Sequence, residues 1–200
     1  MIKTIIFDLG GVVLNRGLWL FRQYLVDEYG VTEEETINVL IKNYYKCYFS
    51  GVITEKDFWK KSLNDLRINA DWQDLRERLL NFFQPNEGMF ELIDNLRNNG
   101  YKTFLLSDQT KEWWPILNKK YSISLHFDDC IISAEVGINK PDPKIYEMVL
   151  KRSNTQSKNS LFVDDLKENL KPAEQLGMKI ILFENCDQLR KELDLMKIRF

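Results

Sequence analysis

Short apolar runs recur along the chain, and the segments between them carry apolar residues at every third or fourth position. Each run is continuous and rich in β-branched or aromatic residues, which is typical of strands buried on both faces of a sheet. Strands that alternate with helices indicate a parallel α/β sheet with right-handed crossovers. The pattern predicts strands at residues 4–7, 102–107, 130–132, 160–165 and 178–183, and helices at 86–99, 142–152 and 166–177.

One long region departs from this alternation. It has no buried-strand pattern, and its apolar positions have helical spacing throughout. We therefore predict a helical-bundle cap domain at 16–84, inserted into a Rossmann-like α/β core domain made of 1–15 and 85–200. The insertion follows the first strand directly, so we expect it to lie next to the carboxyl ends of the strands, where open α/β sheets bind ligands. Its helical patterns cover residues 18–30, 32–49, 54–66 and 71–83.

Composition narrows the function classes. The 200 residues are 44% hydrophobic, enough for one core domain with a modest insertion. The 28 basic and 30 acidic residues form no basic run, which argues against nucleic acid and anionic membranes and favours a small-molecule partner. Three separated cysteines without a CxxC pair indicate reduced thiols. No apolar run approaches 18 residues, so we expect a soluble, cytoplasmic protein; the sequence leaves its oligomeric state open.

Polar residues stand at the ends of several predicted strands. Taken singly, an acid or serine there is more typical of a turn or helix cap, and a loop lysine of a solvated charge. Carboxyl ends of parallel strands meet at one edge of a sheet, so together these residues indicate a site. They are Asp8 after the first strand, Ser107 and Asp108 after the second, Lys140 in the loop GINKPDP, and Asp164 and Asp165 after the run LFV.

The residue types fit phosphoryl transfer. Carboxylates of Asp8, Asp164 and Asp165 in one pocket would repel each other unless a cation neutralised them, and hard oxygen ligands suit Mg²⁺. Lys140 and the Ser107 hydroxyl would hold phosphate oxygens and offset the charge that develops during transfer. Asp8 is then the predicted nucleophile, forming an aspartyl-phosphate that water hydrolyses.

Four segments resemble the motifs of the haloacid dehalogenase (HAD) superfamily, in the branch with a helical cap after the first motif. They are FDLGGVV, LLSDQT, GINKPDPKIY and LFVDDLKENLKPAEQLGMKIILF, and the likeness covers nearly the whole chain. The last segment resembles the phosphatase domain of soluble epoxide hydrolase, and the first, with GVITEKDFW, resembles bacterial sugar-1-phosphatases. The resemblance implies a Mg²⁺-dependent phosphatase acting on a small phosphorylated substrate.

The resemblance also implies individual roles. Asp8 would be nucleophile and metal ligand, the Gly10 carbonyl a second ligand, and Asp165 a third with Asp164 in support. Ser107 would bind the phosphoryl group, and Lys140 would bridge it to the nucleophile. Asp108 stands beside them, at the substrate side of the site.

Two positions depart from the family pattern. Most phosphatases of the superfamily carry a general acid two residues after the nucleophile, where this chain has Gly10. A positioned acid contributes about 10²–10⁴ in rate, so its loss hurts least for acyl, aryl or anomeric sugar phosphates. Gly10 and the resembling relatives together favour a sugar 1-phosphate. Asp108 stands where relatives more often have Asn, and its charge would repel phosphate unless it faces a cation or points away.

Three other functions compete with the phosphatase. A response-regulator receiver has its acidic pair after the first strand, whereas here the pair comes last. A dehalogenase in the strict sense would use Asp8 on carbon without metal, but the resembling dehalogenases carry Tyr at the Gly10 position. A catalytically weak or silent HAD-like binding protein would explain Gly10 and Asp108, although Asp8, Ser107, Lys140 and Asp165 are retained.

Overall fold

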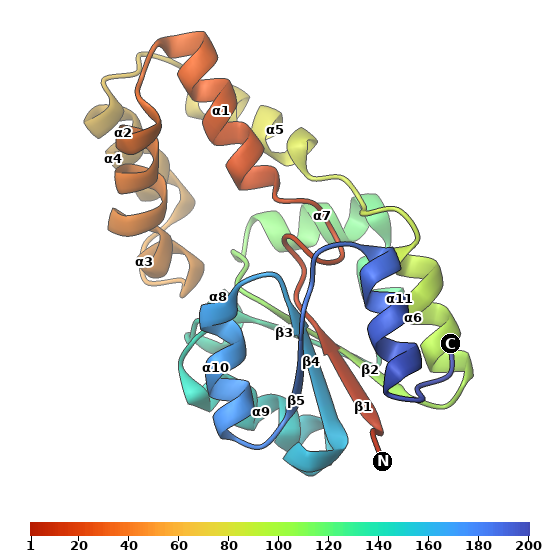
Figure 1. Ribbon diagram of the computed structural model, residues 1–200. Helices are drawn as coiled ribbons and strands as arrows, with labels where there is room; N and C mark the ends of the chain where they lie inside the picture. The colour runs from red at the N-terminus through yellow and green to blue at the C-terminus, as the bar shows by residue number, and fades with distance from the viewer.

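A five-stranded, wholly parallel sheet forms the centre of the molecule in this computed structural model, which describes residues 1–200 (Figure 1). The strand order is β3-β2-β1-β4-β5, so β1 is central and the chain crosses over to both sides of it. The predicted parallel α/β sheet is confirmed. The strands are β1 (Thr4–Phe7), β2 (Lys102–Ser107), β3 (Asp129–Ile132), β4 (Ser160–Asp164) and β5 (Lys179–Leu182).

Helices cover both faces of the sheet because its strands are apolar on both sides. Alternate β1 residues serve different layers: Ile5 and Phe7 belong to one buried cluster and Ile6 to the other. Helices α9 and α10 pack on the Ile6 face, and α6, α7 and α11 on the opposite face (Figure 1). Their bounds are α6 (Met89–Asn98), α7 (Trp113–Tyr121), α9 (Pro143–Ser153), α10 (Lys167–Gln175) and α11 (Cys186–Leu195).

Short elements complete this part of the chain. They are the single-turn helix α8 (Ser133–Val136) and the 3₁₀ turns η2 (Ile123–His126) and η3 (Ser157–Asn159). The sequence pattern did not predict them, nor α11. All three cysteines are free thiols. None of the helices combines the length and the apolar character needed to cross a bilayer.

Every element between β1 and α6 is helical, and we call this group the inserted helices. In Figure 1 they lie together beyond the carboxyl ends of the strands. The predicted helix over 32–49 is wrong as a continuous element, because a π-helical stretch interrupts it. That stretch contains β-branched Ile37, Val39 and Ile41, which crowd an α-helix. The elements are α1 (Gly17–Tyr29), α2 (Glu33–Thr36), η1 (Ile37–Asn43), α3 (Tyr45–Phe49), α4 (Glu55–Leu66) and α5 (Trp72–Phe82).

The two connections between the inserted helices and the sheet run side by side. The backbone N–H of Asn15 donates to the Gln84 carbonyl at 2.8 Å, and the backbone N–H of Asn86 donates to the Val13 carbonyl at 2.9 Å. Gly17 begins α1 so close to the Phe83 ring that an added Cβ would lie 2.6 Å from it. The paired connections hold the inserted helices over the end of β1.

Candidate functional site

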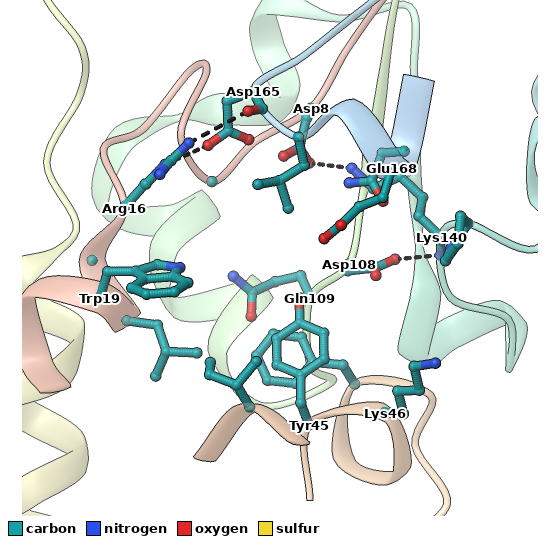
Figure 2. Close-up of a pocket in the computed structure, with 18 of the residues that line it drawn as sticks. Asp8, Arg16, Trp19, Tyr45, Lys46, Asp108, Gln109, Lys140, Asp165 and Glu168 are labelled. Carbon is teal, nitrogen blue, oxygen red and sulfur yellow. Dashed lines mark hydrogen bonds and ion pairs between the residues drawn. The ribbon is translucent and has the colours of Figure 1, made fainter. Parts of the chain in front are cut away.

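A cavity of about 470 Å³ lies between the sheet and the inserted helices. Figure 2 shows Asp8, Asp108 and Asp165 on the sheet side, facing Trp19, Tyr45 and Lys46. The sheet side contributes Asp8, Gly10, Asp108, Gln109, Lys140 and Asp165, and the helical side contributes Leu18, Trp19, Ile41, Tyr45, Lys46 and Phe49.

Lys140 joins two carboxylates at the bottom of this cavity. Its Nζ lies 2.7 Å from Asp8 Oδ1 and 2.7 Å from Asp164 Oδ2, and all three side chains are buried. Asp8 follows β1 and Asp164 ends β4, which pair in parallel with Phe7 opposite Val163. The sheet register therefore brings the two acids together.

Lys140 and the carboxylates around it shift one another's pKa values. Burial opposes the charge on Lys140, but the carboxylates of Asp164, Asp8 and Asp108 outweigh it and raise the pKa of the ammonium well above its ordinary value. Burial raises the pKa of Asp8 well above its usual range; Lys140 opposes this rise, and the carboxylates of Asp164 and Asp165 add to it. The cluster is short of positive charge for its carboxylates.

Asp164 is held in one orientation by donors from the start of α10. Asn169 Nδ2 lies 3.1 Å from each carboxylate oxygen, and the Leu166 amide donates to Oδ1 at 2.8 Å. The Asn169 backbone carbonyl in turn accepts from the Tyr146 hydroxyl at 2.7 Å. Asn169 was missed in the sequence; its place in the first turn of the helix after the acidic pair is the signal that points to it.

Asp165 keeps one oxygen free. Arg16 Nε lies 2.5 Å from its Oδ2, while its Oδ1 is buried without a hydrogen-bond partner. Burial raises the pKa of Asp165, and Arg16 opposes the rise. Arg16 lies in the connection to the inserted helices, and no pattern in the sequence marks it.

The three acids together offer a fit for a divalent cation. One oxygen each from Asp8, Asp164 and Asp165 lie within 4.8 Å of one another. A cation would give the orphaned Oδ1 of Asp165 a partner and would supply the missing positive charge. Carboxylate and carbonyl oxygens are hard ligands of the kind that Mg²⁺ takes.

The remaining predicted residues fall in different places. Asp108 lines the cavity, and its Oδ1 accepts from the Lys140 amide at 2.9 Å. Burial raises the pKa of Asp108 to about 6, with Lys140 opposing. Ser107 ends β2 with 1% of its surface exposed, and it is not among the residues that line the cavity. The structure thus brings Asp8, Asp108, Lys140 and the acidic pair together and leaves Ser107 beneath them.

Gly10 also lines the cavity, and the space above it is empty of other groups. A Cβ built there would find nothing within 4 Å beyond its chain neighbours. Within that distance no side chain takes the place of the acid that Gly10 lacks. The acids to consider beyond it include Glu168, which lines the same cavity (Figure 2).

Residues 5–183 match the family model described as haloacid dehalogenase-like hydrolase. The chain belongs to this family. That match spans the central sheet and the inserted helices, and it includes every predicted site residue.

Individual relatives agree with the assignment. Flavin mononucleotide hydrolase 1 of Arabidopsis thaliana is 28% identical over 72% of this chain, which spans 58% of that protein. Bifunctional epoxide hydrolase 2 of Mus musculus is 33% identical over 54% of this chain but only 20% of its own length. A HAD family enzyme of Bacteroides thetaiotaomicron, crystallised with magnesium and inorganic phosphate, shares the fold at 21% identity, with a TM-score of 0.74 over 94% of this chain and 99% of the other.

Proposed function

We propose that this protein is a Mg²⁺-dependent phosphatase that hydrolyses a small phosphomonoester through an aspartyl-phosphate on Asp8. The observation that carries the proposal is a buried Asp8 carboxylate that lines the cavity and is paired with Lys140, beside an acid with an unpartnered oxygen. The structural neighbour crystallised with magnesium and phosphate supports the same class of chemistry.

In the proposed reaction an Asp8 oxygen attacks phosphorus, and the bond from phosphorus to the ester oxygen breaks with its electron pair on that oxygen. A water molecule then attacks phosphorus, releasing inorganic phosphate and restoring the carboxylate. The Lys140 ammonium, 2.7 Å from Asp8 Oδ1, offsets negative charge that develops on the phosphoryl oxygens. Asp108 lines the cavity just after β2, whereas the proposed contact of Ser107 with the phosphoryl group would require its buried hydroxyl to become accessible.

Asp8, the Gly10 carbonyl and Asp165 are the proposed Mg²⁺ ligands, with Asp164 in support. When bound, the ion would neutralise the carboxylates and stabilise charge on the transferring group. Asp164 already accepts from Lys140 and Asn169, which suits a residue that orients the others.

We also propose that residues 16–84 act as a cap. Their helices close the cavity opposite Asp8, which would exclude water and select the leaving group. The core domain would then comprise 1–15 and 85–200, as the sequence predicts.

The open space at Gly10 sets a condition on the substrate. Without a proton donor there, the leaving oxygen must depart readily, which a sugar 1-phosphate or an aryl phosphate would satisfy. The name of the Arabidopsis relative adds flavin mononucleotide to the test, and because that compound is a primary alkyl phosphate, its turnover would contradict the condition set by Gly10.

The experiment is phosphate release from acetyl phosphate, sugar 1-phosphates, an aryl phosphate and flavin mononucleotide, with Mg²⁺ or EDTA, for wild type and Asp8→Asn. We expect turnover of at least one compound, abolished by EDTA and by the substitution, which keeps the side-chain shape but removes the nucleophile. If wild type is as inactive as Asp8→Asn on every compound, the protein is instead a silent HAD-like binding protein.

A further inference from the structure

We propose that the substrate is an aryl phosphate, whose flat ring lies against Trp19 and Tyr45 while its phosphoryl group meets Asp8. This inference rests on the proposed phosphatase function and narrows its substrate class. Two independent features carry it: the chemistry of the cavity wall opposite Asp8, and the empty space at Gly10.

The wall opposite Asp8 is apolar and aromatic. Helix α1 contributes Leu18 and Trp19, η1 contributes Ile41, and α3 contributes Tyr45 and Phe49. A sugar carries several hydroxyls, and each one removed from water needs a hydrogen-bond partner. These five side chains offer a sugar two polar atoms, the Tyr45 oxygen and the Trp19 nitrogen, but they bury an apolar ring well. The polar side chains Lys46, Gln109 and Glu168 line other parts of the cavity.

Trp19 is an exposed aromatic residue placed at the cavity. Its side chain is 45% exposed, and the Arg22 guanidinium lies over its ring, 4.2 Å from the centroid. Leu20, the next residue, is equally exposed at 46% but does not line the cavity. An exposed indole that faces a cavity is a surface prepared for an apolar ligand.

Tyr45 and Phe49 add a flat surface to the same wall. Their rings are stacked with centroids 3.9 Å apart and planes 16° from parallel. Figure 2 shows the Tyr45 ring pointing from α3 toward Gln109 and the acids beyond it. A planar wall of this kind complements a planar ligand through offset stacking.

Lys46 stands beside Tyr45 at the cavity, on the side opposite the acids (Figure 2). It is exposed, and it is the one charged side chain that α3 brings to the wall. A negatively charged substituent on the ring would meet it there. The cavity, at about 470 Å³, has the size of a small-molecule site and room for more than one fused ring.

The leaving group of an aryl phosphate agrees with the empty space at Gly10. A phenol has a pKa of about 10, so its oxide departs without protonation far more readily than an aliphatic alkoxide. When Asp8 forms its bond to phosphorus, the phosphorus–aryl oxygen bond breaks, the electron pair stays on the aryl oxygen, and that oxide takes its proton from water. The reaction then balances with water as the sole co-reactant.

The test compares kcat/KM for 2-naphthyl phosphate, glucose 1-phosphate and acetyl phosphate in Mg²⁺, for wild type, Trp19→Ala, Trp19→Phe and Leu20→Ala. We expect 2-naphthyl phosphate to be preferred over glucose 1-phosphate. Trp19→Ala should lower kcat/KM for 2-naphthyl phosphate about tenfold, mainly through KM. For acetyl phosphate, which has no ring, Trp19→Ala should cause a clearly smaller loss than for 2-naphthyl phosphate. Trp19→Phe should retain most of the preference, and Leu20→Ala, outside the cavity, should behave as wild type on every compound.

The outcomes separate this inference from the phosphatase proposal. A preference for glucose 1-phosphate, or an equal loss on acetyl phosphate and 2-naphthyl phosphate in Trp19→Ala, would overturn the aryl phosphate and leave the phosphatase standing. Failure of wild type to release phosphate from any of the three compounds, acetyl phosphate included, would overturn both. Binding of the unreactive analogue 2-naphthylmethylphosphonate to Asp8→Asn, weakened by Trp19→Ala and not by Leu20→Ala, supports the ring position without turnover.

Discussion

Gly10 and Gly11 follow Asp8 in the sequence but meet different surroundings. Gly11 has a φ of 99°, and an added Cβ would lie 2.1 Å from Asp165 Oδ2. Both its backbone conformation and the packing of Asp165 against it therefore require glycine. Gly10 has neither constraint, so its lack of a side chain is a chemical property of the site and not a demand of the fold.

Introducing an acid at Gly10 should widen the range of leaving groups. In Gly10→Asp the new carboxyl can protonate the leaving oxygen, so we expect kcat for an alkyl phosphate such as glycerol phosphate to rise about 10²-fold. Aryl phosphate turnover should change little. Gly10→Asn, of the same shape but without an acidic proton, is the control. Equal rates for the two variants on glycerol phosphate would show that the missing acid does not limit the reaction.

Asp108 makes the folded state sensitive to pH. Its pKa, raised by burial from 3.8 to about 6, means that the folded protein holds this proton more tightly than the unfolded chain. Stability from this carboxyl is therefore full below pH 3.8 and is lost as pH rises toward 6.

Asp108→Asn should remove that loss, because the amide does not ionise and its oxygen can still accept from the Lys140 amide. We expect wild type and Asp108→Asn to be equally stable below pH 3.8, where Asp108 is protonated in both the folded and the unfolded chain. Above pH 6 the variant should be more stable by up to about 3 kcal/mol. Urea denaturation across this range, in EDTA, measures the difference. A difference that is constant with pH would contradict the assignment.

At the scale of elements, the strands were predictable because each is an apolar run buried on both faces. The predicted run 102–107 coincides with β2, and the run 160–165 exceeds β4 by Asp165 alone. That last difference matters, because Asp165 leaves the sheet and turns toward Gly11 and Arg16. The predicted alternation of strands and helices makes the strands parallel, and parallel strands bring Asp8, Asp108 and Asp164 together at their carboxyl ends.

The inserted helices were predictable as helices but not in their breaks or their packing. Periodicity does not reveal where a π-helical turn replaces an α-helical one, so η1 was missed. Nor does it reveal contacts between distant segments. The pairing of Arg16 with Asp165 spans 149 positions in the sequence, and the meeting of Glu55 with Trp113 spans 58.

The contact between Glu55 and Trp113 fastens α4 to α7. Trp113 Nε1 donates to Glu55 Oε1 at 2.8 Å, and both residues are buried. Glu55→Leu would leave the indole N–H buried without an acceptor, which should lower the free energy of unfolding by about 1–3 kcal/mol. Glu55→Gln keeps an acceptor in the same place and should lose much less. Equal losses in urea denaturation would mean that this hydrogen bond does not hold the inserted helices to the sheet.

For the whole molecule, the cavity depends on two parts of the chain that the sequence separates. The sheet supplies the charged residues, including Asp8 and Lys140, and the inserted helices supply the apolar wall with Trp19 and Tyr45. The acids of this set were predictable because they follow strand ends, and Lys140 was predicted from its loop motif GINKPDP. The wall was not, because nothing in a helical pattern tells which residues face another part of the protein. The sequence alone favoured a sugar 1-phosphate, and the proposal of an aryl phosphate in its place needed the wall that the structure shows.

The central claim is that Asp8 is the nucleophile, and trapping the phosphorylated protein tests it most directly. Wild type and Asp8→Asn would be mixed with Mg²⁺ and acetyl phosphate, quenched in acid and mapped by peptide mass spectrometry. We predict a phosphoryl group on Asp8 in wild type and none in Asp8→Asn. Phosphate release by wild type with no modification of Asp8, or with a phosphoryl group on another residue, would contradict the account.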